Sequence, residues 1–134
     1  MKTTGFIIIS LFILLAGTAQ NKMYDASAIP EELKKNSYSV IREERIVFEI
    51  KSVDRATCKV HKVVTVLNEN GKDELIFHEF ADRFRSLESV SIQLFDGKGY
   101  PLQKYKRTDL SRQTAGEGLV PDGKLYYIEL PAPS

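Results

Sequence analysis

Cys58 and His61 are the residues whose types could together perform nucleophilic catalysis, since a histidine can activate a cysteine thiol. They lie three positions apart in CKVHKVVTVL, a stretch rich in Val and Thr that is typical of a β-strand. Side chains alternate between the two faces of a strand, so this spacing places thiol and imidazole on opposite faces. We therefore expect Cys58 to be a small buried apolar residue. A hydrolase that depends on Cys58 is an alternative hypothesis for the function of the protein.

Other catalytic or metal-binding sets are incomplete in this sequence. His61 and His78 could meet across neighbouring strands, but a catalytic zinc site uses three protein ligands. Asp109, Glu117 and Asp122 fall in one polar, Gly-rich segment, which offers little of the burial that carboxylate catalysis requires. We predict no catalytic set, no metal site and no cofactor in this chain.

Three tyrosines, Tyr100, Tyr105 and Tyr126, could form an aromatic surface for a glycan or a peptide. Tyr126 is followed by Tyr127, and on a strand these two side chains face opposite ways, so only one can join such a surface. Half-buried strand tyrosines with solvated hydroxyls are the simpler interpretation. A binding module that uses these tyrosines or the 109–123 segment is a second functional hypothesis.

Residues 1–19 are typical of a cleaved secretory signal peptide. Lys2 precedes the apolar run GFIIISLFILLAGTA, which ends in Gly17-Thr18-Ala19, a small-x-small cleavage site. A membrane-spanning helix needs about 20 apolar residues, more than this run supplies. The sequence predicts an exported, periplasmic or extracellular protein with no stable membrane anchor after cleavage.

The charge balance excludes a strongly attractive field for nucleic acid. The chain has 19 basic and 18 acidic residues, and removal of Lys2 with the signal leaves 18 of each. A neutral chain does not concentrate polyanions, so we expect no nucleic-acid partner. Cys58 is the only cysteine, so no internal disulfide can form.

The rest of the chain is expected to be mostly β-structure after a lead-in at residues 20–38. Pro30 and the acids after it predict a short helix that stops near Asn36. Alternating runs predict a hairpin of strands 39–51 and 56–67, with Val40, Ile46, Phe48 and Ile50 on one face. Further strands are expected from Asp73 to about Phe80 and at residues 90–95, 100–106 and 124–130. Residues 109–123 are expected to form a long loop.

Turn residues punctuate these strands. Residues 68–71 form a turn after the second strand, with Asn68 and Gly71 where a positive φ is needed. Asp96 to Gly99 reads DGKG, which supplies the positive φ that a tight hairpin turn needs. Short strands at such intervals predict an all-β fold, an antiparallel β-sandwich over residues 39–134.

Several of these motifs, in this order, resemble a known family. They are the strand and turn VVTVLNENG from Val63, the hairpin LFDGKG from Leu94, and YKRTDL from Tyr105, with Tyr24-Asp25-Ala26 before them and Asp122 after them. The chain resembles, over roughly residues 24–133, the N-terminal domain of unknown function that precedes transglutaminase-like (papain-type cysteine protease-like) domains in secreted bacterial proteins.

This resemblance implies a β-sandwich that is not the catalytic part, because the Cys-His-Asp machinery belongs to the later domain. It gives Thr65, Asn68, Gly71, Asp96 and Gly99 structural roles. The family continues into a further strand and the catalytic core, so the resemblance implies either a fragment, truncated at its C-terminus, or a sandwich that works beside a separate partner. An exposed apolar seam near Leu130-Pro131 is expected to mark that contact.

Overall fold

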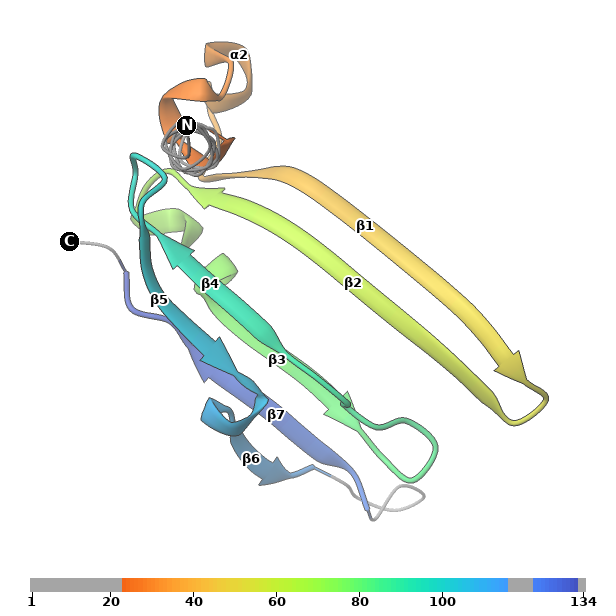
Figure 1. The fold of residues 1–134 in the computed structure, drawn as a ribbon. Helices are drawn as coiled ribbons and strands as arrows, with labels where there is room; N and C mark the ends of the chain where they lie inside the picture. Colours follow the sequence, from red (N-terminus) through yellow and green to blue (C-terminus); the bar gives the residue numbers. More distant parts are fainter. Residues whose placement is uncertain (1–22, 116–121, 133–134) are drawn as a thin grey trace, which may run out of the picture. The chain divides into compact units, whose positions relative to one another are not determined.

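A computed structural model describes residues 23–115 and 122–132, which form mostly β-structure with antiparallel pairing (Figure 1). The predicted signal peptide at residues 1–19 lies outside the described residues. The all-β class expected from the alternating sequence is confirmed. The chain divides into two compact units. We call residues 31–77 with 129–132 the hairpin unit, and the described residues among 1–30 and 78–128 the sheet unit.

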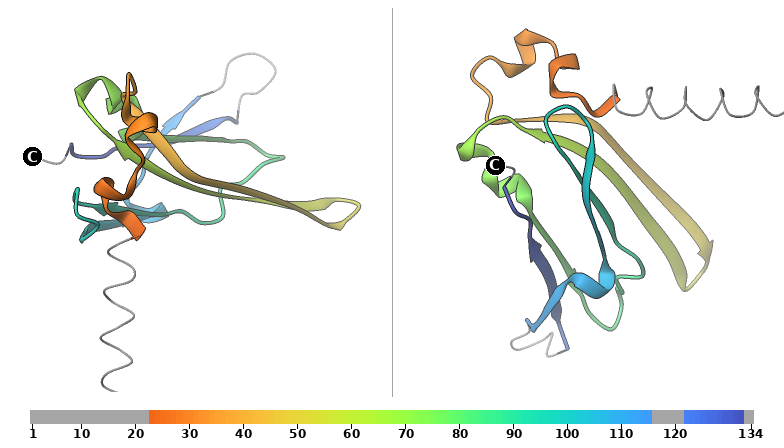
Figure 2. Two further views of the ribbon diagram at one scale, coloured as in Figure 1. Left: turned by 90° about the horizontal axis from the view of Figure 1, so that it is seen from above. Right: turned by 60° about the vertical axis from the view of Figure 1, so that its left-hand side comes forward.

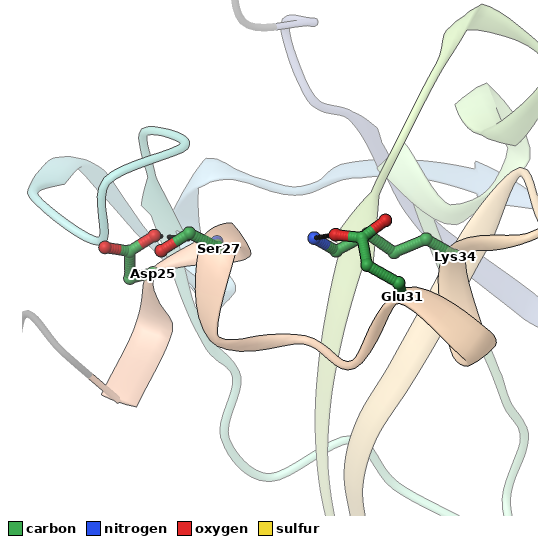
Figure 3. Close-up of polar contacts among 4 residues, drawn as sticks. All are labelled: Asp25, Ser27, Glu31 and Lys34. Carbon is green, nitrogen blue, oxygen red and sulfur yellow. Dashed lines mark hydrogen bonds and ion pairs between the residues drawn. The ribbon is translucent and has the colours of Figure 1, made fainter.

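The hairpin unit begins with a short helix, α2 (Glu31–Lys34), directly after Pro30. Proline is favoured at a helix start because its missing N–H would have no partner there. Asn36 ends the helix with a φ of 61°, a left-handed conformation that Asn tolerates better than most residues. Lys34 Nζ lies 2.8 Å from Glu31 Oε1, an exposed pair of small energetic value (Figure 3). The predicted short helix is confirmed.

The strands β1 (Ser39–Ser52) and β2 (Arg55–Val66) form an antiparallel hairpin, as expected. Figure 2 shows them as two long strands side by side. An irregularity between Ile41 and Glu43 places one extra β1 residue against β2. Such a bulge exchanges the faces of the strand beyond it. Val40 therefore lies on the face opposite Ile46, and the prediction that they share a face is wrong.

After β2 the chain enters a 3₁₀ segment, η2 (Glu69–Leu75). Asn68 caps it, since its Oδ1 accepts a hydrogen bond from Asn70 N at 3.0 Å. Gly71 is buried and, unlike Gly99, does not have a positive φ. Its requirement is space, because a Cβ at this position would overlap the carbonyl oxygen of Tyr38. The predicted turn is present, but the prediction that Gly71 supplies a positive φ there is wrong.

The sheet unit contains most of a three-stranded sheet in the order β3-β7-β6, formed by β3 (Ile76–Ala81), β6 (Ser111–Thr114) and β7 (Lys124–Glu129). β6 pairs antiparallel with β7. β6 lies inside the segment that was expected to be a loop, so that prediction is wrong in part. Its residues SRQT lack an apolar alternation, and pairing with β7 rather than its own pattern makes it a strand.

A second hairpin in this unit joins β4 (Ser91–Phe95) to β5 (Pro101–Lys106), as predicted. Asp96 organises the turn, because its Oδ1 accepts hydrogen bonds from Lys98 N at 2.9 Å and Tyr100 N at 2.8 Å. Gly99 has a φ of 82°, the left-handed value that the DGKG pattern predicts.

The N-terminal residues of the sheet unit contact this turn. The short 3₁₀ helix η1 (Ala26–Ala28) is capped by Asp25, whose Oδ1 accepts a hydrogen bond from Ser27 N at 2.7 Å (Figure 3). Ala26 N donates to Gly97 O at 3.0 Å. The rings of Tyr24 and Phe95 stack with centroids 4.2 Å apart. These contacts attach residues 24–28 to the β4–β5 hairpin.

Few apolar side chains are buried in the described part of the chain. They are Ile29, Val40, Ala81 and Leu130, each 9% exposed or less. Among the residues that the structure describes, fifteen large hydrophobic side chains are instead exposed, and six of them lie in β1 and β2. The sequences of β1 and β2 alternate as half-buried strands do, but their apolar side chains remain largely exposed.

We predict that Gly71→Ala destabilises the fold by about 1–3 kcal/mol, because the added methyl must displace the Tyr38 carbonyl. Gly97→Ala is the matched control, since nothing lies within 4 Å of its Cβ position. Urea denaturation followed by circular dichroism measures both. Equal stability of the two variants would contradict the close approach.

Candidate functional site

The outer part of the β1–β2 hairpin has one face made only of apolar side chains. Residues directly opposite each other in an antiparallel pair share a face. The register places the members of each β1/β2 pair on this face. We call this set the apolar face, and it consists of Ile46 with Val60, Phe48 with Cys58, and Ile50 with Ala56.

The apolar face is open to solvent. Ile46 is 62% exposed, Phe48 65%, Ile50 74% and Val60 62%. An exposed apolar surface on one face of a hairpin is a candidate interaction surface. Within the hairpin unit itself, no residue covers these side chains to the degree that a core would.

The opposite face of the same hairpin is polar and carries both signs of charge. The pairs on it are Arg45 with His61, Val47 with Lys59, and Glu49 with Thr57. A strand with one apolar and one charged face is built to be buried on one side only. The hairpin therefore has a solvent side and a side suited to a partner surface.

Cys58 is exposed in the middle of the apolar face, so the expectation that it is buried is wrong. The reason is that the hairpin unit supplies no second layer to pack on this face. His61 lies on the other face, opposite Arg45, as the spacing predicts. Its Nε2 is 3.9 Å from Glu43 Oε2, and Glu43 also accepts a hydrogen bond from Arg45 at 2.7 Å. The geometry does not bring the thiol and the imidazole together.

The histidines and acids considered as sites come from different elements, with His61 in β2 and His78 in β3. Residues 23–115 and 122–132 contain no group of three or more His, Cys, Asp or Glu side chains that could hold a metal ion. Asp109 Oδ2 accepts a hydrogen bond from Lys106 N at 2.6 Å and so caps the 3₁₀ helix η3 (Arg107–Asp109). Glu117 lies outside the described residues.

The three tyrosines proposed as a binding surface are divided between two separate sheets. Tyr100 and Tyr105 belong to the β4–β5 hairpin, and Tyr126 lies in β7. Tyr100 is 53% exposed, whereas Tyr105 and Tyr126 are half-buried. Their common use as a surface stays a prediction.

Tyr126 has a distinctive electrostatic environment. The Arg107 guanidinium carbon lies 5.7 Å from the centroid of its ring. Arg112 is its cross-strand neighbour in the β6–β7 pair. Hydrogen bonding from Arg107 to the phenolate lowers the pKa of Tyr126, and Arg112 contributes in the same direction.

The region near Leu130 is not an exposed apolar seam. Leu130 is only 8% exposed, and its N–H donates to Leu75 O at 2.8 Å. Its backbone thus pairs with Leu75, the last residue of η2. The prediction of an apolar contact surface there is wrong for Leu130, and the exposed apolar surface lies on the β1–β2 hairpin instead.

Comparisons with known proteins do not assign the chain to a family. No family model, curated protein or solved structure matches this chain. Within the described ranges, no helix has the length and apolar character needed to cross a membrane.

The sequence contained the signal for the apolar face. Ile46, Phe48 and Ile50 alternate in β1, and the spacing of Ala56, Cys58 and Val60 matches them in β2. The hairpin register joins the two sets into one surface. What the pattern could not show is that the hairpin unit itself supplies no cover for this surface.

We predict that Cys58 of the folded protein reacts with a thiol reagent such as DTNB without denaturant, because its side chain is exposed. Absorbance at 412 nm follows the reaction, and Cys58→Ser supplies the blank. The native rate should lie within about tenfold of the rate in urea. Labelling only after unfolding would show that the thiol is covered.

Proposed function

We propose that this chain is an exported, non-catalytic accessory β domain that packs on or positions a transglutaminase-like (papain-type cysteine protease-like) domain, in the same polypeptide or in a neighbouring one. The observation that carries this proposal is the open apolar face of the β1–β2 hairpin. The choice of partner rests on the family that the turn motifs around Asn68 and Asp96 resemble.

The chemistry of the apolar face supports a protein partner rather than a small polar ligand. Its six side chains contain no hydrogen-bond donor or acceptor other than the weakly polar thiol of Cys58. Burying exposed Val, Ile and Phe side chains provides about 1.5–3 kcal/mol each when burial is complete. A folded domain with its own apolar patch can bury all of them together.

The central position of Phe48 makes it the expected main contact. It is 65% exposed and is flanked along β1 by Ile46 and Ile50. Aromatic residues near the centre of a contact commonly carry much of the binding energy, while their neighbours exclude water.

The placement of the candidate residues also supports a non-catalytic role. Cys58 and His61 lie on opposite faces of β2, which removes the geometric basis of the hydrolase alternative. No specific observation on Tyr100 and Tyr105 favours the glycan- or peptide-binding module.

The proposal is tested with a transglutaminase-like domain encoded in the same reading frame or in an adjacent gene of the native locus. We expect this domain, purified separately, to form a one-to-one complex with the present chain by isothermal titration calorimetry. We expect Phe48→Ser to weaken the complex about tenfold or more, because burial of this ring is lost.

Val47→Ser is the matched control, because Val47 is 48% exposed but lies on the opposite, charged face of the same strand. It should leave the affinity within about twofold of the original. In the complex, DTNB labelling of Cys58 should slow strongly, since Cys58 is paired with Phe48. Absence of a complex, or equal weakening by the two substitutions, would reject the proposal.

A further inference from the structure

We propose that Arg107, Arg112 and the Tyr126 hydroxyl form a binding site for an oxyanion, the carboxylate or phosphate group of a ligand. The site lies in the sheet unit, on residues other than those of the apolar face. The proposal is therefore independent of the docking function and can stand or fail without it.

The backbone places the three side chains together. Arg112 and Tyr126 are directly opposite in the β6–β7 pair, so their side chains share one face. Arg107 belongs to η3, which precedes β6 by a single residue, and its guanidinium carbon lies 5.7 Å from the Tyr126 ring centroid. An arginine stacked on a ring in this way keeps its in-plane N–H donors available to a further acceptor.

The neighbouring residue pair on the same face adds a further positive charge. Thr114 and Lys124 are paired with each other, two residues along from Arg112 and Tyr126, so period-two alternation puts all four on one face. The face thus combines two arginines and a lysine with two hydroxyl groups.

No carboxylate is paired with either arginine among the described ion pairs. Asp109 is the nearest acid along the chain, and its Oδ2 accepts a hydrogen bond from the backbone N–H of Lys106 at 2.6 Å rather than from either arginine. Two guanidinium groups next to a phenol, without a neutralising acid in the described contacts, make an electropositive cluster that an anion would stabilise.

The titration of Tyr126 is consistent with this cluster. Arg107, by hydrogen bonding and by its charge, and Arg112 in the same two ways, favour the phenolate and lower the pKa of Tyr126. The same groups can favour the negative charge of a bound ligand. A bound oxyanion would lie close to the phenol and would raise the pKa of Tyr126 again, because like charges disfavour ionisation.

The ligand chemistry follows from the donors. Arginine N–H groups fit carboxylate and phosphate oxygens in bidentate geometry, and a protonated tyrosine donates one further hydrogen bond. A neutral glycan lacks the charge that two arginines would neutralise, so an acidic group on the ligand is the feature recognised.

The test titrates the full chain with inorganic phosphate and, separately, with acetate, each against sodium chloride at the same ionic strength. Arginine Nε–H resonances and the 295 nm titration of the tyrosines are followed. We expect saturable shifts of the Arg107 and Arg112 resonances and a raised pKa of Tyr126 in at least one of the two anions. Tighter binding of phosphate identifies a phosphate ligand, and tighter binding of acetate identifies a carboxylate ligand.

Substitutions assign the site. Arg107→Gln and Arg112→Gln should each weaken binding about tenfold, as expected for loss of a charge-assisted hydrogen bond. Arg83→Gln is the matched control, because Arg83 lies 4.8 Å from the Phe84 ring centroid, a similar stacking without a hydroxyl group. Tyr126→Phe should weaken binding, whereas Tyr127→Phe, on the opposite face of β7, should not.

Shifts no larger than those produced by chloride would overturn the proposal. Equal weakening by Arg83→Gln and Arg107→Gln would also overturn it, since that result indicates general screening of surface charge. Circular dichroism of each variant verifies that the fold is retained.

Discussion

The register between β1 and β2 is the constraint on which the hairpin unit depends. It pairs Phe48 with Cys58 and thereby assembles one apolar surface from two separate strand sequences. A shift of one residue would turn these side chains to the other face and mix them with charges. The irregularity between Ile41 and Glu43 fixes where the faces exchange. It lets Val40 be buried near the base of the hairpin while Ile46 contributes to the outer apolar face.

This arrangement explains why so little of the described chain is buried although its strands alternate as half-buried strands do. The cross-strand hydrogen bonds of β1 and β2 satisfy the backbone, but they do not remove Ile50 or Val60 from water. A two-stranded hairpin without a covering layer is marginally stable by itself. A covering surface would supply the burial that the hairpin lacks, which links the energetics of the fold to the proposed accessory role.

The sheet unit uses the same two-face principle for a different purpose. Consecutive tyrosines in β7 point to opposite faces, and only Tyr126 meets the arginines. Arg107 reaches this ring because η3 turns the chain between β5 and β6, with Asp109 as its cap. A local cap thus positions a charged side chain near a strand that is distant in the sequence.

Much of this protein could be predicted from the sequence alone. The alternation in β1 and β2 predicted the hairpin, Pro30 and Asn36 predicted the bounds of α2, and the DGKG segment predicted the positive φ of Gly99. These features are local, because they depend on the φ preferences of single residues and on the period of side chains along a strand.

Other features were decided only by tertiary structure, because they depend on residues far apart in the chain. Gly71 is required by the approach of the Tyr38 backbone, and β6 is a strand because β7 lies beside it. The exposure of Cys58 and the burial of Leu130 likewise depend on what packs on them. A single sequence states which residues can face a core, but only the assembled structure determines which of them are covered, since burial is a property of the contacts between segments.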